Sequence, residues 1–382
     1  MTTATVTLTD RLLALRDRLY ASAAFHRAAS AFPLTRPFAR RRARELFDLV
    51  AGFVYSQVLS ACVKLDLFRK LSHGPMSLAQ LSLHCQMTTE ATDRLLAAAI
   101  SLKLIEPRGS DERGQPRFGL GVLGAPLVDN EGVLAMIRHH DTLYADLADP
   151  VALLRGQGPA PALSGFYPYT ADDAPAQAGG LAADHVGNYS QLMAASQPLV
   201  ATEILDAYSF DRHHRLLDVG GGEGRFLCSV AARAPHLQLA LFDLPAVADR
   251  ARARFATAGL SQRAQAIGGN FLSDPIPTGF DIVSLVRVIH DHDEQRALTI
   301  LRSIHQALPP GGTLLLAEPM AGTPGAEAMG DAYFGFYLLA MGRGRARTAE
   351  QLSALLRQAG FSAIRAVPTR IPLQVRMLVA MR

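Results

Sequence analysis

The chain has 382 residues, of which 49% are hydrophobic and 19% charged, so we expect a globular protein with more than one domain and little disorder. None of its three cysteines is in a CxxC pair, so neither a disulfide framework nor a zinc site is indicated. The net charge of +4 is too small to indicate a nucleic-acid partner, no apolar run reaches the roughly 18 residues of a membrane span, and no secretory signal is evident.

The first 42 residues are expected to form a basic helical arm. Apolar positions recur at helical spacing in residues 10–32, and five arginines follow between Arg36 and Arg44, with a single acid, Glu45, behind them. Such a helix can expose a solvated arginine face, pack as an arm exchanged between subunits, or lie on an anionic membrane surface. These alternatives stay open, and no nucleic-acid partner is expected.

Residues 43–185 are expected to form a winged-helix-like dimerisation domain followed by a linker. Three helical stretches come first, with Ser77 and then Thr88 or Thr89 as N-caps, and an alternating segment between turn residues predicts a β-hairpin after them. The helix that would enter DNA has as many acids as bases, which is poor electrostatics for phosphate contact, so dimerisation is the expected use. The linker is the Gly-, Pro- and Ala-rich stretch 150–180.

From Arg215 onward, the pattern predicts a parallel sheet. Short apolar runs read RLLDV, LQLALFDL, DIVSLVRVI, TLLLAEPM and VRMLVAMR, and helical stretches separate the first four. Strands that alternate with helices form a doubly wound α/β sheet with helices on both faces. We therefore expect residues 186–382 to form a ligand-binding α/β domain, because ligands bind such sheets at the carboxyl ends of the strands.

The stretch LLDVGGGEGRF places a glycine turn between the first strand and the next helix. Asp218, Gly220, Gly222 and Gly224 give the pattern D-x-G-x-G-x-G, in which glycine permits positive φ and lets a ligand touch the backbone. The dinucleotide fingerprint G-x-G-x-x-G is not matched, because Arg225 takes the place of the third glycine, and no Walker lysine follows. Asp218 would repel a pyrophosphate but suits a cofactor that carries a cationic amino group.

Two later strand ends supply further groups at the same edge. Asp243 ends its strand in the run LFDLP, where a carboxylate can accept hydrogen bonds from ribose hydroxyls; the alternative is a helix cap before Pro245. Asn270 and Phe271 follow the next strand, where an amide could bond the edge of an adenine and a ring could stack on it. A cationic amino group, a ribose and an adenine together describe S-adenosylmethionine (SAM).

The motifs LLDVGGGEG, LFDLP, GGNF, HDHDE, ALPPGGTLLLAEP and RTAEQLSALLRQAGF stand in an order that resembles the SAM-dependent O-methyltransferases of the caffeate and polyketide type. The resemblance runs from about Leu46 to the C-terminus and implies a seven-stranded, mostly parallel class I methyltransferase sheet, a winged-helix dimerisation domain and a homodimer. Residues 32–68 further resemble the hydroxycarotenoid O-methyltransferases of purple bacteria, which methylate the tertiary C1-hydroxyl of acyclic carotenoids such as hydroxyneurosporene and demethylspheroidene. The related bacteriochlorophyllide C-20 methyltransferases share the architecture.

The stretch LVRVIHDHDEQRA, residues 285–297, admits three interpretations. His290, His292 and Asp293 could chelate a metal, but the H-x-H-x-D-H pattern is incomplete and transfer from a sulfonium needs no metal, so none is expected. Asp291 or Asp293 could cap a helix, which accounts for most of DHDE. The third interpretation is that His290 is a general base at the strand end. In the resembling family the histidine of an HDW motif has this role, with His292 here in place of tryptophan.

The resemblance also implies groups around this base. Glu318, at the end of the run LLLAE, would hold His290 in orientation. A second acid of the family lies just before an Arg-Thr pair, where this chain has Ala346, and Asp331 could substitute for it. Arg287, within the strand that leads to His290, is expected to face the cofactor edge.

The expected substrate is an apolar small molecule with a hydroxyl group. Met193 and Ser196, on a helix before the sheet, and Tyr333 and Tyr337, in the segment DAYFGFYLLAMG, are expected to line its pocket, although core packing would also explain them. Phenols, polyketides or tetrapyrroles are alternative substrates, and a DNA-binding regulator with a vestigial ligand domain is an alternative function. We expect a cytoplasmic protein, with peripheral contact to the inner or photosynthetic membrane if its arm binds lipid.

Overall fold

The computed structural model describes residues 7–165 and 197–382. The chain divides into two compact units, residues 1–128 and residues 129–382. The boundary expected at residues 185–186 falls among residues that the structure does not describe, so that division of the chain stays a prediction.

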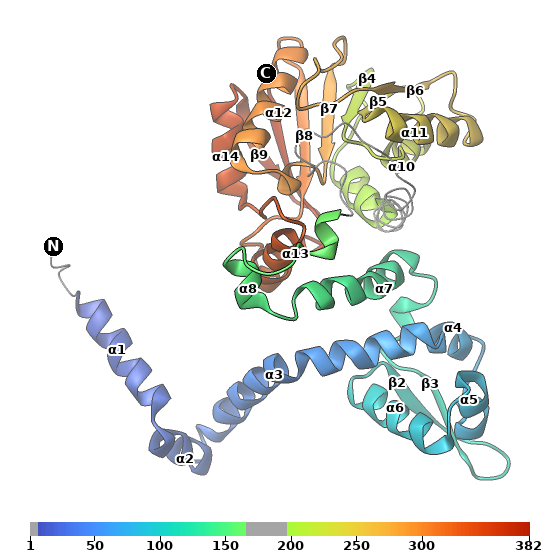
Figure 1. The fold of residues 1–382 in the computed structure, drawn as a ribbon, viewed down its shortest axis with the longest axis vertical. Helices are drawn as coiled ribbons and strands as arrows, with labels where there is room; N and C mark the ends of the chain where they lie inside the picture. Colours follow the sequence, from blue (N-terminus) through green and yellow to red (C-terminus); the bar gives the residue numbers. More distant parts are fainter. Residues whose placement is uncertain (1–6, 166–196) are drawn as a thin grey trace. The chain divides into compact units, whose positions relative to one another are not determined.

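The first unit begins with three helices, α1 (Leu8–Ala21), α2 (Ala23–Ala31) and α3 (Arg36–Lys64), drawn in blue in Figure 1. The described part of the expected arm is thus helical, and α3 runs without a break past residue 42. Thr7 caps α1 through a capping box with Asp10, and Ser22 caps α2 by accepting a hydrogen bond from the amide of Phe25. None of the residues of α1 or α2 is buried, so both helices present their apolar side chains to solvent or to a partner.

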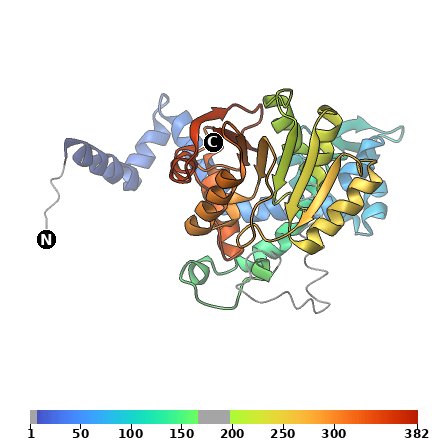
Figure 2. The same ribbon diagram turned by 90° about the horizontal axis from the view of Figure 1, so that it is seen from above.

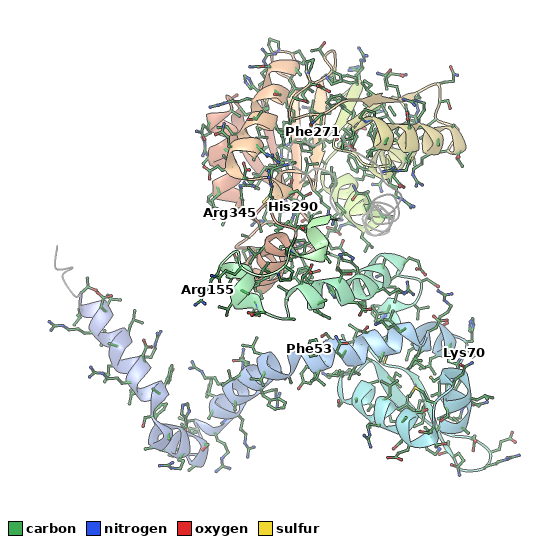
Figure 3. The ribbon with its side chains drawn as sticks, viewed as in Figure 1. Phe53, Lys70, Arg155, Phe271, His290 and Arg345 are labelled. Atoms are coloured by element: carbon green, nitrogen blue, oxygen red, sulfur yellow. The ribbon has the colours of Figure 1, made fainter. Side chains whose placement is uncertain are left out.

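Helix α3 is long and apolar enough to reach the dimensions of a membrane span. An 18-residue window within it has a mean hydropathy of 1.6, and 17% of that window is buried. The expectation that no apolar stretch reaches this length is therefore wrong, because Asp48 is the single charged residue between Leu46 and Val63. Length and composition do not distinguish a span from an interface helix. The C-terminal end packs into the first unit through Cys62 and Val63, whereas Phe53, labelled in Figure 3, is exposed.

The rest of the first unit has the expected order of helices followed by a hairpin. Ser77 begins a helix with a capping box, and Thr88 accepts a hydrogen bond from the amide of Ala91 at the start of the next, as predicted. The hairpin is joined by a short strand that the sequence did not predict, and the three strands form an antiparallel sheet in the order β1-β3-β2. The elements are α4 (Leu67–Ser72), β1 (Met76–Ser77), α5 (Leu78–Cys85), α6 (Thr89–Ser101), β2 (Ile105–Ser110), β3 (Pro116–Leu120) and η1 (Ala125–Leu127).

The second unit is built on a seven-stranded sheet with the order β6-β5-β4-β7-β8-β10-β9. Strand β10 is antiparallel to both of its neighbours, and the pairs among the first five strands are parallel, so the predicted α/β fold class is confirmed. The strands are β4 (Arg215–Val219), β5 (Gln238–Asp243), β6 (Ala264–Gly268), β7 (Ile282–Val286), β8 (Thr313–Glu318), β9 (Ser362–Val367) and β10 (Arg376–Met381). Edge strand β9 escaped prediction because most of its residues are exposed and give no continuous apolar run.

Helices cover both faces of this sheet, as Figures 1 and 2 show. Alternate residues of the strands point to opposite faces, so Leu217 joins a core with α12 and α14, whereas Leu216 joins a second core with α10 and α11. The helices of this unit include α7 (Glu131–Asp146), α8 (Pro150–Leu154), η2 (Ala162–Gly165), α10 (Arg225–Arg233), α11 (Pro245–Thr257), η3 (Ile289–Asp291), α12 (Glu294–Ala307), η4 (Ala328–Tyr333), α13 (Phe334–Ala340) and α14 (Ala349–Gln358), and residues 197–207 are helical as well.

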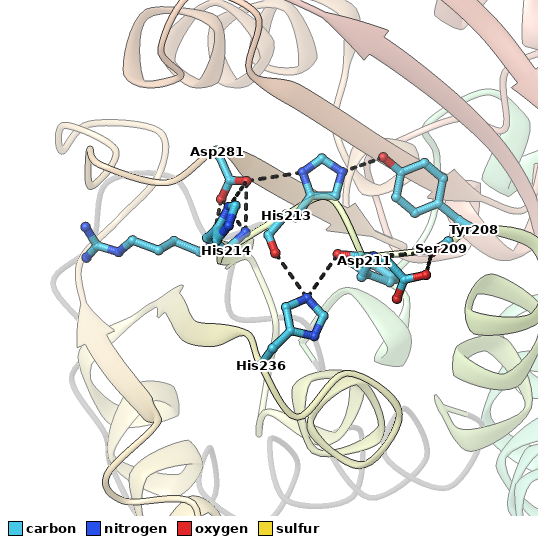
Figure 4. Close-up of polar contacts among 9 residues, drawn as sticks. Tyr208, Ser209, Asp211, His213, His214, His236 and Asp281 are labelled. Carbon is cyan, nitrogen blue, oxygen red and sulfur yellow. Dashed lines mark hydrogen bonds and ion pairs between the residues drawn. The ribbon is translucent and has the colours of Figure 1, made fainter.

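A polar cluster fixes the amino ends of the central strands, as Figure 4 shows. The carboxylate of Asp281, directly before β7, accepts hydrogen bonds from the amides of His214 (3.0 Å) and Arg215 (2.6 Å) at the start of β4. Nδ1 of His213 lies 3.3 Å from the same carboxylate, and Nε2 of His213 lies 2.7 Å from the hydroxyl of Tyr208. This cluster fixes the register of β4 against β7. It therefore also fixes where the loops that follow these two strands begin, at the opposite, carboxyl edge of the sheet.

Candidate active site

The glycine loop follows β4 and requires glycine on steric grounds. Gly220 and Gly222 have φ angles of 70° and 59°, in the left-handed region that favours glycine. A Cβ at Gly220 would lie 2.8 Å from Cγ2 of Val288 and 3.6 Å from the ring of Phe271, whereas one at Gly222 would meet nothing within 4 Å. Gly220 thus lets the loop after β4 touch the loops that follow β7 and β6, while Gly222 leaves open space beside the backbone.

Asp218 is fully buried beneath this loop. One carboxylate oxygen accepts a hydrogen bond from the hydroxyl of Ser284 (2.6 Å), and the other, Oδ2, has no hydrogen-bond partner among the described residues. Burial raises the pKa of Asp218 to about 7; the Ser284 hydrogen bond opposes this rise and the nearby charge of Asp243 adds to it. A buried carboxylate oxygen that lacks a partner among the described residues fits a cationic group at the glycine loop, as the amino group of SAM would provide.

Asp243 ends β5, and its carboxylate holds the glycine loop through the amide of Gly222. Its Oδ2 accepts a hydrogen bond from the amide of Gly222 (2.8 Å), and its Oδ1 accepts one from the amide of Leu244 (2.7 Å). The helix-cap alternative is wrong, because the N-cap residue of α11 is Leu244 and no side chain caps that helix. Asp243 is therefore fixed at the strand end, next to the turn that would hold a ligand.

The segment after β6 brings Asn270 and Phe271 to the same edge. Oδ1 of Asn270 accepts a hydrogen bond from the amide of Leu272 (3.0 Å), which stabilises the local turn. Phe271 is buried and makes an edge contact with the ring of His292, with ring centroids 5.7 Å apart. Figure 3 labels Phe271 and His290, both of which lie in the second unit.

The loop that carries His290 starts earlier than the sequence predicted. Strand β7 ends at Val286, because Arg287 adopts φ of 59° in the left-handed region, although its amide still donates to the carbonyl of Ala317 (2.8 Å). His290 therefore lies on the short helix η3 and not directly on the strand end, which corrects the expected strand through Ile289. A non-glycine residue in this conformation is strained and is held by the contacts of the loop.

Glu318 ends β8 and binds this loop through three donors. Its Oε1 accepts hydrogen bonds from the amides of Val288 (3.0 Å) and Ile289 (2.7 Å), and its Oε2 accepts one from Nδ1 of His290 (2.5 Å). Glu318 is 1% exposed and His290 8%, so the contact is shielded from water. Since Nδ1 is the donor to Glu318, Nε2 is the ring nitrogen left for chemistry.

Asp291 places a second carboxylate at His290, which sequence reasoning missed. Its Oδ1 lies 3.2 Å from Nε2 of His290. Burial alone lowers the pKa of His290, but the carboxylates of Asp291 and Glu318 outweigh burial and leave that pKa raised. The sequence assigned Asp291 or Asp293 to a helix cap, and Asp293 is the cap, since its carboxylate accepts the amide of Arg296 (2.9 Å).

The remaining residues of the cluster do not gather around a common ion. Among the described residues, no three histidine, cysteine or acidic side chains are placed to share a metal. His292 is buried against Phe271, and burial, with the nearby charge of His290, lowers its pKa to about 4. Asp331 is exposed and accepts a hydrogen bond from the amide of Gly322 (3.1 Å), so the second acid beside His290 is Asp291 instead.

An aromatic wall faces His290 from the other side. The ring of Phe334 lies 6.2 Å from that of His290, and Tyr333 and Tyr337 pack around Phe334. Two histidines of α7 hold the tyrosine hydroxyls: the hydroxyl of Tyr337 lies 3.0 Å from Nε2 of His139, and that of Tyr333 lies 2.8 Å from Nε2 of His140. The rings of each pair are also in contact. The predicted pocket residues Met193 and Ser196 lie outside the described residues.

These features together define a class of protein. A seven-stranded sheet with one antiparallel strand, a glycine turn after β4 and an acid at the end of β5 form a class I methyltransferase fold. A buried histidine and glutamate pair at the same edge is suited to removing a proton from an acceptor.

Comparison with known proteins identifies the family. Residues 144–362 match the model of the O-methyltransferase domain, and residues 47–129 match that of the O-methyltransferase dimerisation domain. The chain therefore belongs to the O-methyltransferase family, as the sequence motifs predicted. The match to the dimerisation domain supports the expected homodimer.

Two bacterial relatives align with nearly the whole chain. The demethylspheroidene O-methyltransferase of Cereibacter sphaeroides is 40% identical over 366 residues, which cover 96% of this chain and 94% of that protein. The enzyme of the same name from Rhodobacter capsulatus is 39% identical over 368 residues, covering 96% and 88%. Among solved structures, human N-acetylserotonin methyltransferase in complex with SAM has a TM-score of 0.71 at 22% identity, covering 89% of this chain and 97% of that one, and shows the shared fold.

Proposed function

We propose that this chain transfers the methyl group of SAM to the tertiary C1-hydroxyl of an acyclic hydroxycarotenoid such as demethylspheroidene. The observation that carries the chemistry is the buried contact between His290 and Glu318 at the sheet edge that also bears the glycine loop. The two bacterial relatives named above support the carotenoid substrate, because their identity to this chain extends over 96% of its length. No comparison favours the alternative of a DNA-binding regulator.

The cofactor would lie along the carboxyl edge of β4, β5 and β6. In this proposal Asp218 faces the amino group, Gly220 and Gly222 permit close approach to the backbone, and Asp243 accepts hydrogen bonds from the ribose. Asn270 and Phe271 would contact the adenine, and the cation of Arg287 would border the site near His290, where it opposes protonation of that histidine. The buried Oδ2 of Asp218, which lacks a partner within the described structure, supports the assignment of a cationic ligand.

The proposed chemistry centres on Nε2 of His290. When bound, SAM supplies a methyl group on a sulfonium sulfur, which is an activated leaving group. The acceptor oxygen would form the new C–O bond as the C–S bond broke with its electron pair left on sulfur, and Nε2 of His290 would take the hydroxyl proton. Glu318 fixes the ring through Nδ1, and Asp291 lies beside the nitrogen that receives the proton, so both carboxylates stabilise the imidazolium.

A tertiary alcohol is a very weak acid, so its proton has to leave during attack and not before it. Positioning of the oxygen against the methyl group then contributes much of the rate. Tyr333 and Tyr337 would form the pocket wall that sets this position, with Met193 and Ser196 as further candidates in the segment that the structure does not describe. Phe334, a member of the segment DAYFGFYLLAMG that was expected to form the pocket wall, joins this wall because its ring packs on that of His290.

The substrate assignment is tested with labelled SAM and a panel of acceptors. We expect methylation of demethylspheroidene and hydroxyneurosporene, with little transfer to simple phenols or bacteriochlorophyllides. A preference for a phenol or a tetrapyrrole would overturn the carotenoid assignment while leaving the enzyme class intact. The variant His290→Ala serves as the control for transfer without the base.

We further propose that the N-terminal arm holds the enzyme on an anionic membrane surface, where carotenoids dissolve. The first 45 residues contain nine arginines and three acids, a net charge of +6, whereas the whole chain has a net charge of +4. Exposed apolar side chains accompany these arginines, among them Leu12, Leu34 and Phe38. A basic helix with exposed apolar residues suits the boundary between headgroups and acyl chains.

Deletion of residues 1–42 tests the role of the arm. We expect the truncated protein to lose binding to vesicles that contain phosphatidylglycerol and to lose activity on carotenoid embedded in them, while activity on detergent-dispersed carotenoid persists. The control is a full-length variant in which the five arginines from 36 to 44 are changed to glutamine, which keeps the helix and lowers the net charge of residues 1–45 from +6 to +1. Unchanged vesicle binding by the truncated protein would contradict the proposal.

A further inference from the structure

Both the amides and the carbonyls of the backbone around His290 are held by buried side chains. Its amides at Val288 and Ile289 donate to Glu318, as described above. Its carbonyls are bound by the segment GRGRART, residues 342–348, which follows α13. The two guanidinium nitrogens of Arg347 donate to the carbonyls of Ile289 (3.0 Å) and His292 (2.8 Å), on either side of His290.

The same segment contacts the carbonyl of His290 itself. The amide of Arg345 donates to it at 2.9 Å. Gly344 has φ of 95°, and a Cβ there would lie 2.3 Å from that carbonyl oxygen, so only glycine permits this approach. The carbonyl of Arg347 in turn accepts the amide of Ala321 (3.0 Å), which ties the segment to the chain just after β8 and Glu318.

Arg347 is buried, although an arginine without a specific use is normally exposed. Its side chain is 4% exposed. Burial lowers its pKa, and the negative charge of Glu318 works in the opposite direction. The loop therefore lies between a buried anion that binds its amides and a buried cation that binds its carbonyls, and each charge reduces the cost of burying the other.

We infer that Arg347 is a positioning residue for the methyl transfer. Arg347 clamps the loop that carries His290, so that Nδ1 of His290 contacts Glu318 and Nε2 of His290 faces the acceptor. The planar fork of a guanidinium is suited to this task, since it spans the carbonyls of Ile289 and His292, which are three positions apart along the chain. Arg347 is the arginine of the Arg-Thr pair that the resembling family shares, so the clamp does not replace the family's second acid. This chain has Ala346 in the place of that acid, and the second carboxylate at His290 comes from Asp291.

Two ways in which Arg347 could act predict opposite shifts at His290. If Arg347 acted only through its charge, its removal would raise the pKa of His290, because a nearby cation disfavours the imidazolium. If it acts by position, its removal frees the loop and weakens the contact between His290 and Glu318. The pKa of His290 then falls, because burial lowers it and the carboxylates are what raise it.

The test compares Arg347→Met and Arg347→Lys with the control Arg345→Met in the full-length protein. Arg345 holds the carbonyl of His290 through its backbone amide, so its side chain can be changed without loss of that bond. Figure 3 labels Arg345 and His290. The measurements are kcat at saturating SAM and acceptor, the Kd of SAM by calorimetry, the melting temperature, and the titration of His290 by NMR, with its signal assigned by its loss in His290→Ala.

We expect Arg347→Met to lower kcat on the order of 10²-fold, the size of effect that follows a misplacement of about 1 Å at a reacting group. The Kd of SAM should stay within about twofold, and the NMR titration of His290 should move to lower pH. Arg347→Lys keeps the charge but not the fork and should lose roughly tenfold in kcat. Arg345→Met should match the wild type, and Arg347→Met should cost little further kcat once Glu318→Gln has released the loop.

An unchanged or raised His290 titration in Arg347→Met, or a kcat within threefold of Arg345→Met, would overturn the inference. If Arg347→Met does not fold, Arg347→Lys carries the same test with the charge retained. The inference rests on the proposed role of His290 as the base. The NMR titration and the SAM affinity require no acceptor, so failure of the clamp is distinguishable from an error in the substrate.

Discussion

Replacement of Asp218 by asparagine tests the electrostatics of the cofactor edge. The pKa of Asp218 rises from 3.8 to about 7 because the carboxyl is fully buried. A rise of this size corresponds to ~4 kcal/mol of differential interaction between the two protonation states. The folded protein keeps a proton that the unfolded chain loses above pH 3.8. The stability of the cofactor-free protein therefore falls by up to ~4 kcal/mol as the pH rises from 3.8 through about 7.

Asparagine carries no charge, so the variant lacks this loss of stability. Its oxygen can still accept the hydroxyl of Ser284, but its NH2 group would occupy the position of Oδ2, which has no partner among the described residues. A buried donor of this kind costs about 1–3 kcal/mol at every pH. We therefore expect Asp218→Asn to be less stable than the wild type at pH 4.5 and more stable at pH 8, so that the two stability profiles cross.

Urea unfolding without cofactor between pH 4.5 and 8.5 measures this difference. Asp281→Asn is the matched control with the opposite sign. The pKa of Asp281 is lowered: burial alone would raise it, but the amides of Arg215 and His214 outweigh burial. The stability from Asp281 is present above the unfolded pKa and is lost as the pH falls, so its variant should be weakest relative to the wild type at high pH. If Asp218→Asn and the wild type show parallel profiles, the assigned environment of Asp218 is refuted.

Three further predictions concern the base, its acids and the glycine loop. His290→Ala should lower kcat by roughly 10²- to 10⁴-fold while the Kd of SAM stays unchanged, and a parallel loss of SAM binding would show that His290 belongs to the cofactor site. The base has to be neutral to accept a proton, so activity should rise as the pH rises through the raised pKa of His290. Asp291→Asn removes one of the charges that raise this pKa, so it should move the acidic limb of the kcat profile to lower pH. Gly220→Ala and Gly222→Ala share the strain of a positive φ, on the order of 1 kcal/mol. Only Gly220→Ala places a Cβ against Val288, so it should lower the melting temperature more than Gly222→Ala does. Equal decreases in melting temperature would contradict the packing described for the loop.

The features that sequence reasoning located are those that stand at the ends of buried strands. Asp218, Asp243 and Glu318 each sit at the carboxyl end of an apolar run, and parallel strands bring those ends to one edge whatever the details of the loops. Local patterning and the rule for parallel sheets were enough to place these acids, whereas the role of Glu318 came from the resemblance to the methyltransferase family. The same logic placed His290 at this edge, although Arg287 ends the strand early and a short helix carries the histidine.

Groups that act through long-range packing could not be found in this way. His139 meets Tyr337 across 198 positions of sequence, and no local pattern relates the two. Arg347 gave no signal because an arginine after a glycine-rich turn is usually a solvated side chain. Asp291 was visible in the sequence but was assigned to the start of α12, since an acid before a helix is more often a cap than a partner of its neighbour.

The wall opposite His290 contains four polar side chains that carry no charge near pH 7, two histidines and two tyrosines, and such a wall suits a hydrocarbon substrate. Burial, with the neighbouring charge of His140, lowers the pKa of His139 to about 4, and burial also lowers that of His140, so both rings are neutral near pH 7. Burial raises the pKa of Tyr333 and Tyr337, which keeps their hydroxyls protonated. Each hydroxyl is paired with a histidine, so an apolar chain can cover this wall without leaving a polar group unsatisfied. A charged phenolate or carboxylate substrate would gain nothing from these four side chains, whereas an uncharged tertiary alcohol on a long hydrocarbon loses nothing.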